Sequence, residues 1–116
     1  NHENDNEYKY MTKGTIKVNF KEIVISLNQA HDETRPDLVA YVSLHLKDEH
    51  ERNFICNGFT LRKSKHNKDQ LYLALPCKKT GSAFFKFNLI EKTLFKEIEK
   101  EAVRLYQYID IPIIDE

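Results

Sequence analysis

The chain has 116 residues, enough for one domain with a modest core and too few for two. Its 18 basic and 18 acidic residues give a formal net charge of zero, so any affinity for nucleic acid must come from local clustering of charge. No stretch approaches the roughly 20 consecutive apolar residues of a membrane span, and the first residues are polar and acidic. We therefore expect a soluble, cytoplasmic protein.

Apolar content divides the chain into three parts. Residues 1–14 are mostly polar, and we expect them to form a disordered amino-terminal segment. Residues 15–110 carry all the strand and helix patterns and form the single predicted domain. Pro112 stops any continuation of a helix, so residues 111–116 are predicted to be a tail.

The first strand pattern changes parity partway along. Apolar residues alternate over 16–20 and again over 23–27, but on the opposite parity. The segment therefore either contains a bulge near Lys21 and Glu22 or forms two strands. A polar loop over 28–37 follows, and it ends at Pro36 and Asp37.

Four further strands are predicted downstream of this loop. They cover residues 38–47, 53–62, 70–76 and 83–87, and a tight turn over 78–82 joins the last two. Gly58 lies inside the second of these strands, where a glycine marks a bulge or a close approach by another backbone. Short connections between successive strands favour an antiparallel meander.

An amphipathic helix is predicted from about Leu89 to Ile109. Asn88 is placed to cap it, with Glu91 at capping-box spacing. One apolar stripe recurs at helical spacing, formed by Leu94, Ile98, Ala102, Leu105 and Ile109. A helix of about 19 residues is ~28 Å long at 1.5 Å per residue and can cover one sheet face only.

The uncovered sheet face predicts self-association. We expect it to carry Tyr41, Tyr72 and Phe59 or their neighbours. So much apolar surface is unusual in water, and a homodimer is the simplest cover. The predicted fold is thus α+β, an antiparallel β-meander of about five strands with one C-terminal amphipathic helix packed on one sheet face.

Motifs for enzyme chemistry are absent from the sequence. There is no GxxxxGK[ST], GxGxxG, HExxH, CxxC or GxSxG pattern, so we expect no enzyme, no cofactor and no small-molecule substrate. A metal site at His45, His50 and Glu51 can be imagined, but a solvated polar turn explains them better, and no metal is expected. Cys56 and Cys77 lie in apolar strand patterns, where buried free thiols are expected rather than a disulfide.

One segment concentrates positive charge. Residues 60–86 contain seven basic residues and one acidic residue, a local charge of +6. The basic residues are Arg62, Lys63, Lys65, Lys68, Lys78, Lys79 and Lys86. If Arg62, Lys86 and Tyr72 share a face, bases and an aromatic ring interleave as a stacking and phosphate-binding surface requires. The same lysines could equally be ordinary residues of solvent-exposed turns.

The segment Leu71–Thr80, Leu-Tyr-Leu-Ala-Leu-Pro-Cys-Lys-Lys-Thr, resembles a known bacterial pattern. It is similar to the Leu-Phe-Val-Ala-Met-Pro-Ser-Lys-Arg-Thr type of segment in the family of the stage V sporulation protein G (SpoVG), small septation regulators. Phe54–Leu61 is similar to that family's Phe-Val-Val-His-Asp-Ile-Arg-Val strand, and Phe85-Lys86 resembles its Phe-Arg pair.

The resemblance implies a function as well as a fold. It implies a small α+β homodimer that binds DNA or RNA and regulates gene expression, and it points to Lys78, Lys79 and Thr80 as nucleic-acid contacts. From the charge pattern we expect Arg62 and Lys86 to support these contacts. Because no stretch is apolar enough for a membrane span, we expect no membrane partner. The alternative is a protein-interaction adaptor that has the same fold and no affinity for nucleic acid.

Overall fold

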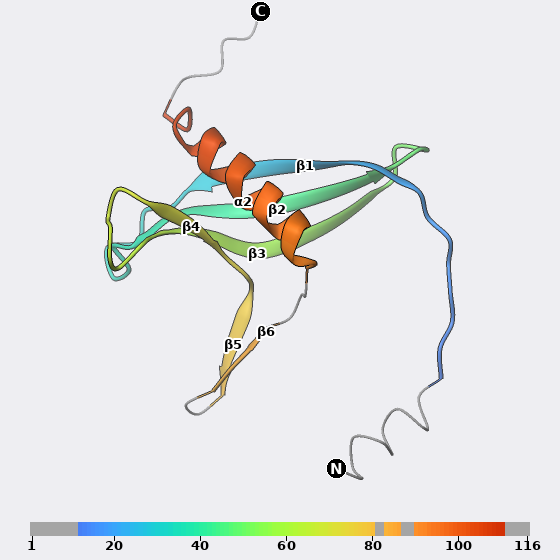
Figure 1. Ribbon diagram of the computed structural model, residues 1–116, viewed down its shortest axis with the longest axis horizontal. Coiled ribbons are helices and arrows are strands. Elements are labelled where there is room, and N and C mark those ends of the chain that lie inside the picture. Colours follow the sequence, from blue (N-terminus) through green and yellow to red (C-terminus); the bar gives the residue numbers. More distant parts are fainter. Residues whose placement is uncertain (1–11, 81–82, 87–89, 111–116) are drawn as a thin grey trace, which may run out of the picture.

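The computed structural model describes residues 12–80, 83–86 and 90–110 (Figure 1). The expectations for residues 1–11, the tip of the 78–82 turn, Asn88 and the tail lie outside the described residues. The elements in chain order are β1 (Phe20–Gln29), β2 (Leu38–Asp48), β3 (Asn53–Lys63), β4 (Leu71–Ala74), β5 (Cys77–Thr80), β6 (Ala83–Lys86) and α2 (Lys92–Tyr106).

The first four strands form one antiparallel sheet in the order β1-β2-β3-β4, and α2 crosses one of its faces (Figure 1). The predicted α+β meander with a C-terminal helix is confirmed. Among the described residues, β5 and β6 pair only with each other, as a hairpin that leaves the sheet (Figure 1). Pairing between β3 and β4 stops at Ala74, ahead of Pro76, which has no amide N–H to donate to a ladder.

The parity change in the first strand is a bulge. Phe20 pairs with Asp48 and Glu22 pairs with Lys47, so Lys21 is one extra residue in β1. This confirms the bulge rather than two strands, because the extra residue returns the apolar positions after it to the helix side of the sheet. The prediction that residues 16–19 are strand was wrong: β2 ends at Asp48, and no strand in the described part of the chain pairs with these residues.

A second bulge, at Asn57 and Gly58, sets which residues of β3 face the helix. The two residues lie opposite Ser43 alone, because β3 and β2 pair again at Phe59. Gly58 has a φ of +94°, a conformation that other residues rarely adopt. The bulge turns Phe59 into the core, where it is 1% exposed. The expectation that it lies on the uncovered face was therefore wrong.

The core lies between α2 and the sheet. From the helix, Ile98 and Ala102 are buried, and Phe95 packs at the margin. The buried sheet residues are Val39, Ala40, Val42, Leu44, Phe59, Leu61 and Leu73. The helix begins later than predicted because Glu91 caps it, accepting hydrogen bonds from the amides of Thr93 and Leu94 at 3.1 Å each, and it ends at Tyr106, before the predicted Ile109.

Asp48 holds the turn between β2 and β3. Its side chain is nearly fully buried. One carboxylate oxygen accepts the amides of His50 and Arg52 at 2.9 and 2.8 Å, and the other accepts Arg52 Nε at 2.5 Å. Burial opposes ionisation, but the hydrogen bonds from Arg52 and His50 outweigh it and hold the pKa of Asp48 below its ordinary value.

The lowered pKa of Asp48 predicts a pH-dependent contribution to stability. Its stabilisation is present above the unfolded pKa of about 4 and is lost as the pH falls through the lower folded pKa. Asp48→Asn should therefore lower the melting temperature at pH 7, and the gap to the parent protein should close as the solution is acidified. Glu49→Gln, which changes an exposed carboxylate on the same turn, is the control. A gap that does not depend on pH would contradict this role.

Gly58 predicts a large effect for a small substitution. A Cβ at this position would lie 3.2 Å from Pro76 Cβ and 3.3 Å from Pro76 Cγ, in a backbone conformation that strains any other residue. Gly58→Ala should cost about 1–3 kcal/mol in the free energy of urea unfolding. Gly14→Ala is the matched control, because its added methyl group meets nothing within 4 Å. Equal effects of the two substitutions would refute the bulge as a strained point.

Candidate nucleic-acid interface

The sheet face opposite α2 carries two tyrosines on successive rows of that face. Tyr41 on β2 pairs with Thr60 on β3, which pairs with Ala74 on β4. Two positions further along the ladder, and so on the same face, Arg62 pairs with Tyr72. Tyr41 is 45% exposed and Tyr72 is 38% exposed, so both rings are accessible to solvent. The expectation that these two tyrosines lie on the uncovered face is confirmed.

These side chains line a hollow of about 660 Å³, which we call the tyrosine hollow. Its lining residues are Arg35, Asp37, Tyr41, Gly58, Thr60, Arg62, Lys65, Tyr72, Ala74, Leu75 and Cys77. Three are basic and one is acidic, so the hollow has a local positive charge. Proteins that bind single-stranded nucleic acids combine aromatic rings, on which bases stack, with basic groups that contact phosphates.

Arg62 is fixed across the floor of the hollow. Its Nε donates to Thr60 Oγ1 at 3.1 Å, and one terminal nitrogen donates to Asp37 Oδ2 at 3.1 Å. The arginine side chain is 24% exposed and the aspartate 46%. A guanidinium has five N–H donors, so two bonds orient it and leave other donors available for a phosphate.

Arg35 enters the hollow from the loop before β2. Its Nε donates to Asp32 Oδ2 at 3.1 Å. The same aspartate accepts the hydroxyl and amide of Thr34 at 2.5 and 2.9 Å. These Thr34 bonds, followed by the Arg35 charge, hold the pKa of Asp32 below its ordinary value. Asp32 thus stays ionised and anchors the loop at neutral pH.

The predicted lysine contacts lie on the hairpin, outside the hollow. Lys78, Lys79 and Thr80 belong to β5, which corrects the prediction that this segment is a turn. Lys78 is exposed. Cys77 begins β5 and lines the hollow, and it pairs with Lys86 across the hairpin. The base of the hairpin therefore adjoins the hollow, and Lys78 and Lys79 follow along β5.

The structure thus unites part of the predicted site. Arg62 and Tyr72 are direct cross-strand neighbours, as the shared-face hypothesis required, but Lys86, the third residue of that hypothesis, lies on β6 of the separate hairpin. Sequence reasoning missed Arg35 and Asp37, which it assigned to a polar loop. Their basic and acidic character was visible in the sequence, but only the pairing of β2 with β3 brings the end of that loop beside Arg62.

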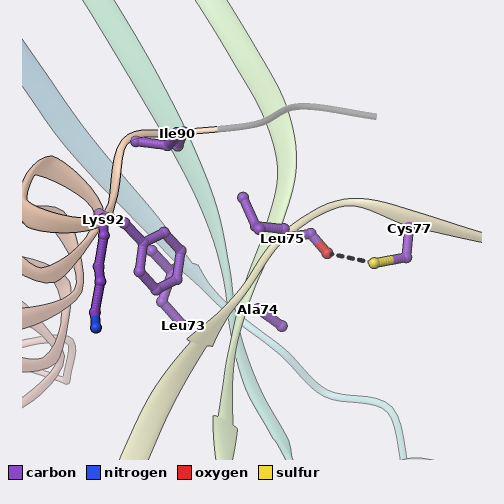
Figure 2. A pocket seen from close by; sticks show the side chains of 7 residues that line it. Leu73, Ala74, Leu75, Cys77, Ile90 and Lys92 are labelled. Carbon is purple, nitrogen blue, oxygen red and sulfur yellow. Dashed lines mark hydrogen bonds between the residues drawn. The ribbon is translucent and has the colours of Figure 1, made fainter. Parts of the chain in front are cut away.

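A second hollow, of about 480 Å³, separates the start of α2 from the strand that leads into the hairpin (Figure 2). Its lining is apolar except for Lys92 and Cys77. Cys77 Sγ donates to the carbonyl oxygen of Leu75 at 3.3 Å, and Cys77 is exposed rather than buried as predicted. Because its lining offers so few polar groups, this hollow is a weaker candidate for nucleic acid than the tyrosine hollow.

The described residues offer little for metal chemistry. Within the described ranges, no group of three or more His, Cys, Asp or Glu side chains is arranged to hold a metal ion. The Nε2 atom of His45 lies 3.1 Å from Ser26 Oγ, as part of the open sheet face. Among the same residues, no helix has the length and apolar character to cross a membrane.

Comparisons with known protein families, with curated proteins and with solved structures find no match to this chain.

Proposed function

We propose that the protein binds nucleic acid, DNA or RNA, through the open face of its sheet, and that it acts as a cytoplasmic homodimer in the control of gene expression. The observation that carries the proposal is the tyrosine hollow, where two accessible rings lie among three basic side chains. The regulatory role rests on the similarity of Leu71–Thr80 to the SpoVG family.

A single strand suits this surface better than a duplex. Tyr41 and Tyr72 are accessible and lie two strands apart, with Thr60 and Arg62 between them on β3. Unpaired bases can stack on such rings whatever their identity, and each stacked base contributes about 1–3 kcal/mol. Base pairs in a duplex are already stacked and offer no free face to a flat sheet.

The hairpin would extend the contact along the backbone of the bound strand. Lys78 and Lys79 lie on β5, which starts at the edge of the hollow. Lysine binds phosphate as a point charge and neutralises it without reading sequence. A single-stranded nucleic acid could thus stack its bases in the hollow and run along the hairpin. The lysine charges would raise its affinity, and the stacked bases would set its orientation.

The adaptor alternative also has an observation in its favour. Phe54 is 62% exposed and Ile55 is 49% exposed, on opposite faces of β3 near the β2–β3 turn. Apolar side chains in such positions suit contact with another protein. If the protein binds no oligonucleotide at low salt, the adaptor function replaces the proposed one.

Loss of one ring should weaken binding of a single strand. Tyr72→Ala is expected to reduce the affinity for a fluorescent oligothymidylate of about 15 nucleotides by roughly 5- to 150-fold, the equivalent of one stacked base. Tyr72→Phe keeps the ring and should bind nearly as the parent does. The measurement is fluorescence anisotropy at fixed salt.

The control for this substitution is Tyr108→Ala. Tyr108 is 51% exposed and lies in the turn after α2, outside the hollow. It should leave affinity unchanged. Equal binding by Tyr72→Ala and the parent, with both proteins folded by circular dichroism, would exclude the tyrosine hollow as the stacking surface.

The hairpin lysines should be visible in the salt dependence. Each phosphate neutralised contributes a slope of about −0.7 in log affinity against log salt for single strands and about −0.9 for duplex DNA. Removing Lys78 and Lys79 together by substitution with alanine should flatten the slope by about 1.4 on a single strand. The loss of affinity should be similar for all base compositions, because phosphate contacts carry no sequence information.

A matched double variant separates contact from overall charge. Lys96 and Lys100 are exposed on α2, so replacing both with alanine removes the same charge from a different surface. This variant should keep the parent slope. A folded Lys78→Ala, Lys79→Ala variant with unchanged affinity and slope would show that the hairpin is not a contact.

A further inference from the structure

The two edges of the sheet are treated differently by the rest of the chain. The β4 edge is only four residues long, and the Leu73 amide donates to Glu99 Oε2 from α2 at 3.0 Å. A side chain that occupies an edge amide, and a short strand, are both ways in which proteins block pairing with another sheet. The β4 edge is therefore closed.

The β1 edge has no such protection. It is ten residues long, and residues 23–29 contain no charged residue and no proline. In the described part of the chain, β1 pairs only with β2, so its outer edge is unpaired (Figure 1). Ile23, Ile25 and Leu27 pack against the core but are only partly buried. Residues 23–29 thus form an uncharged and mostly apolar stretch of edge, which is a ready template for another strand.

We propose that β1 pairs antiparallel with β1 of a second copy of this chain, across a two-fold axis, to form one continuous eight-stranded sheet. The inference rests on the homodimer in the proposed function and names its interface. It differs from the cover expected from sequence, because it uses an edge of the sheet and not its open face.

A second copy fits this edge because the edge is complementary to itself. With the two-fold axis at Ile25, Ile23 lies opposite Leu27 of the partner subunit, and Val24 lies opposite Ser26 of the partner subunit. The helix-side apolar rows of the two sheets then join, and the charge-free stretch brings no like charges together. A two-fold interface requires this kind of match between one surface and its own copy.

Edge pairing also leaves the nucleic-acid surface free. A two-fold axis perpendicular to the sheet places both tyrosine hollows on the same side of the eight-stranded sheet. The two copies of β3 are then five strand spacings apart, about 24 Å at ~4.8 Å per spacing. The two hollows are also displaced in opposite directions along the strands, because Tyr41 pairs with Asn28, three residues from the axis. One long single-stranded nucleic acid could therefore contact both hollows. The second contact would raise its affinity for the dimer through a high effective concentration.

A charge at the edge should break the dimer, and the same charge further inside the sheet should not. Val24, on the edge strand, and Ile55, on central strand β3, lie in one ladder row on either side of His45. Their exposures are similar, 40% and 49%. We expect the parent to sediment at twice the 13.8 kDa chain mass at micromolar concentration. Val24→Lys should sediment at the single mass, and Ile55→Lys at the double mass.

Nucleic-acid binding gives a second, independent result. For an oligothymidylate of about 30 nucleotides, Val24→Lys should bind at least 10-fold more weakly than the parent, because it loses the second hollow. For one of about 6 nucleotides, which reaches one hollow, the two proteins should bind alike. Circular dichroism shows whether Val24→Lys remains folded, and Val24→Thr, which keeps the β-branched shape without charge, should remain dimeric.

The outcomes separate the interface from the rest of the proposed function. A parent protein that is monomeric throughout refutes both the homodimer and this interface, whatever its affinity for nucleic acid. A folded, dimeric Val24→Lys variant refutes the edge alone. Dissociation by Ile55→Lys would assign the dimer to the open face and overturn the inference. Failure of Tyr72→Ala to weaken binding would refute the tyrosine hollow and leave the edge interface intact.

Discussion

The bulge at Gly58 is the constraint on which the rest of the molecule depends. Because Asn57 and Gly58 occupy the space of one residue opposite β2, the parity of β3 reverses there. Phe59 is turned into the core under α2, and Arg62 is turned outward beside Tyr72. Pro76 packs 3.2 Å from where a Gly58 Cβ would lie, so the same point also fixes where the chain leaves the sheet. The arrangement of the core, of the open face and of the hairpin thus depends on Gly58.

The two faces of the sheet follow from one helix and four strands. Helix α2 covers one face with Ile98 and Ala102 and uses Glu99 to occupy the β4 edge. It leaves the other face with rings, hydroxyls and guanidinium groups in ladder rows. That asymmetry lets a small domain expose aromatic and polar side chains on one face without weakening its core, because the exposed side chains contribute little to packing. In the described part of the chain the outer edge of β1 is also unpaired, and the proposed second copy would pair with it without covering the tyrosine hollow.

Local pattern predicted much of this, and its failures have physical causes. The bulge near Lys21 followed from a parity change, and the bulge at Gly58 from the cost of glycine in a strand. The predicted strand over residues 16–19 failed because alternation shows that a segment can form a strand, whereas pairing depends on whether a neighbour reaches it. The lysine segment failed as a turn for a related reason, since β5 is a strand only because β6 lies beside it.

The sequence by itself determined the fold class, because a periodicity of two followed by one near 3.6 predicts strands and then a helix. It also showed that basic residues concentrate in the segment after Thr60. Only the tertiary structure decided which charged residues meet. Arg35 and Arg62 are 27 positions apart in the chain, yet they line one hollow with Tyr41 and Tyr72 because strand register brings them together. Register depends on bulges, turns and core packing acting together, and no local pattern encodes that sum.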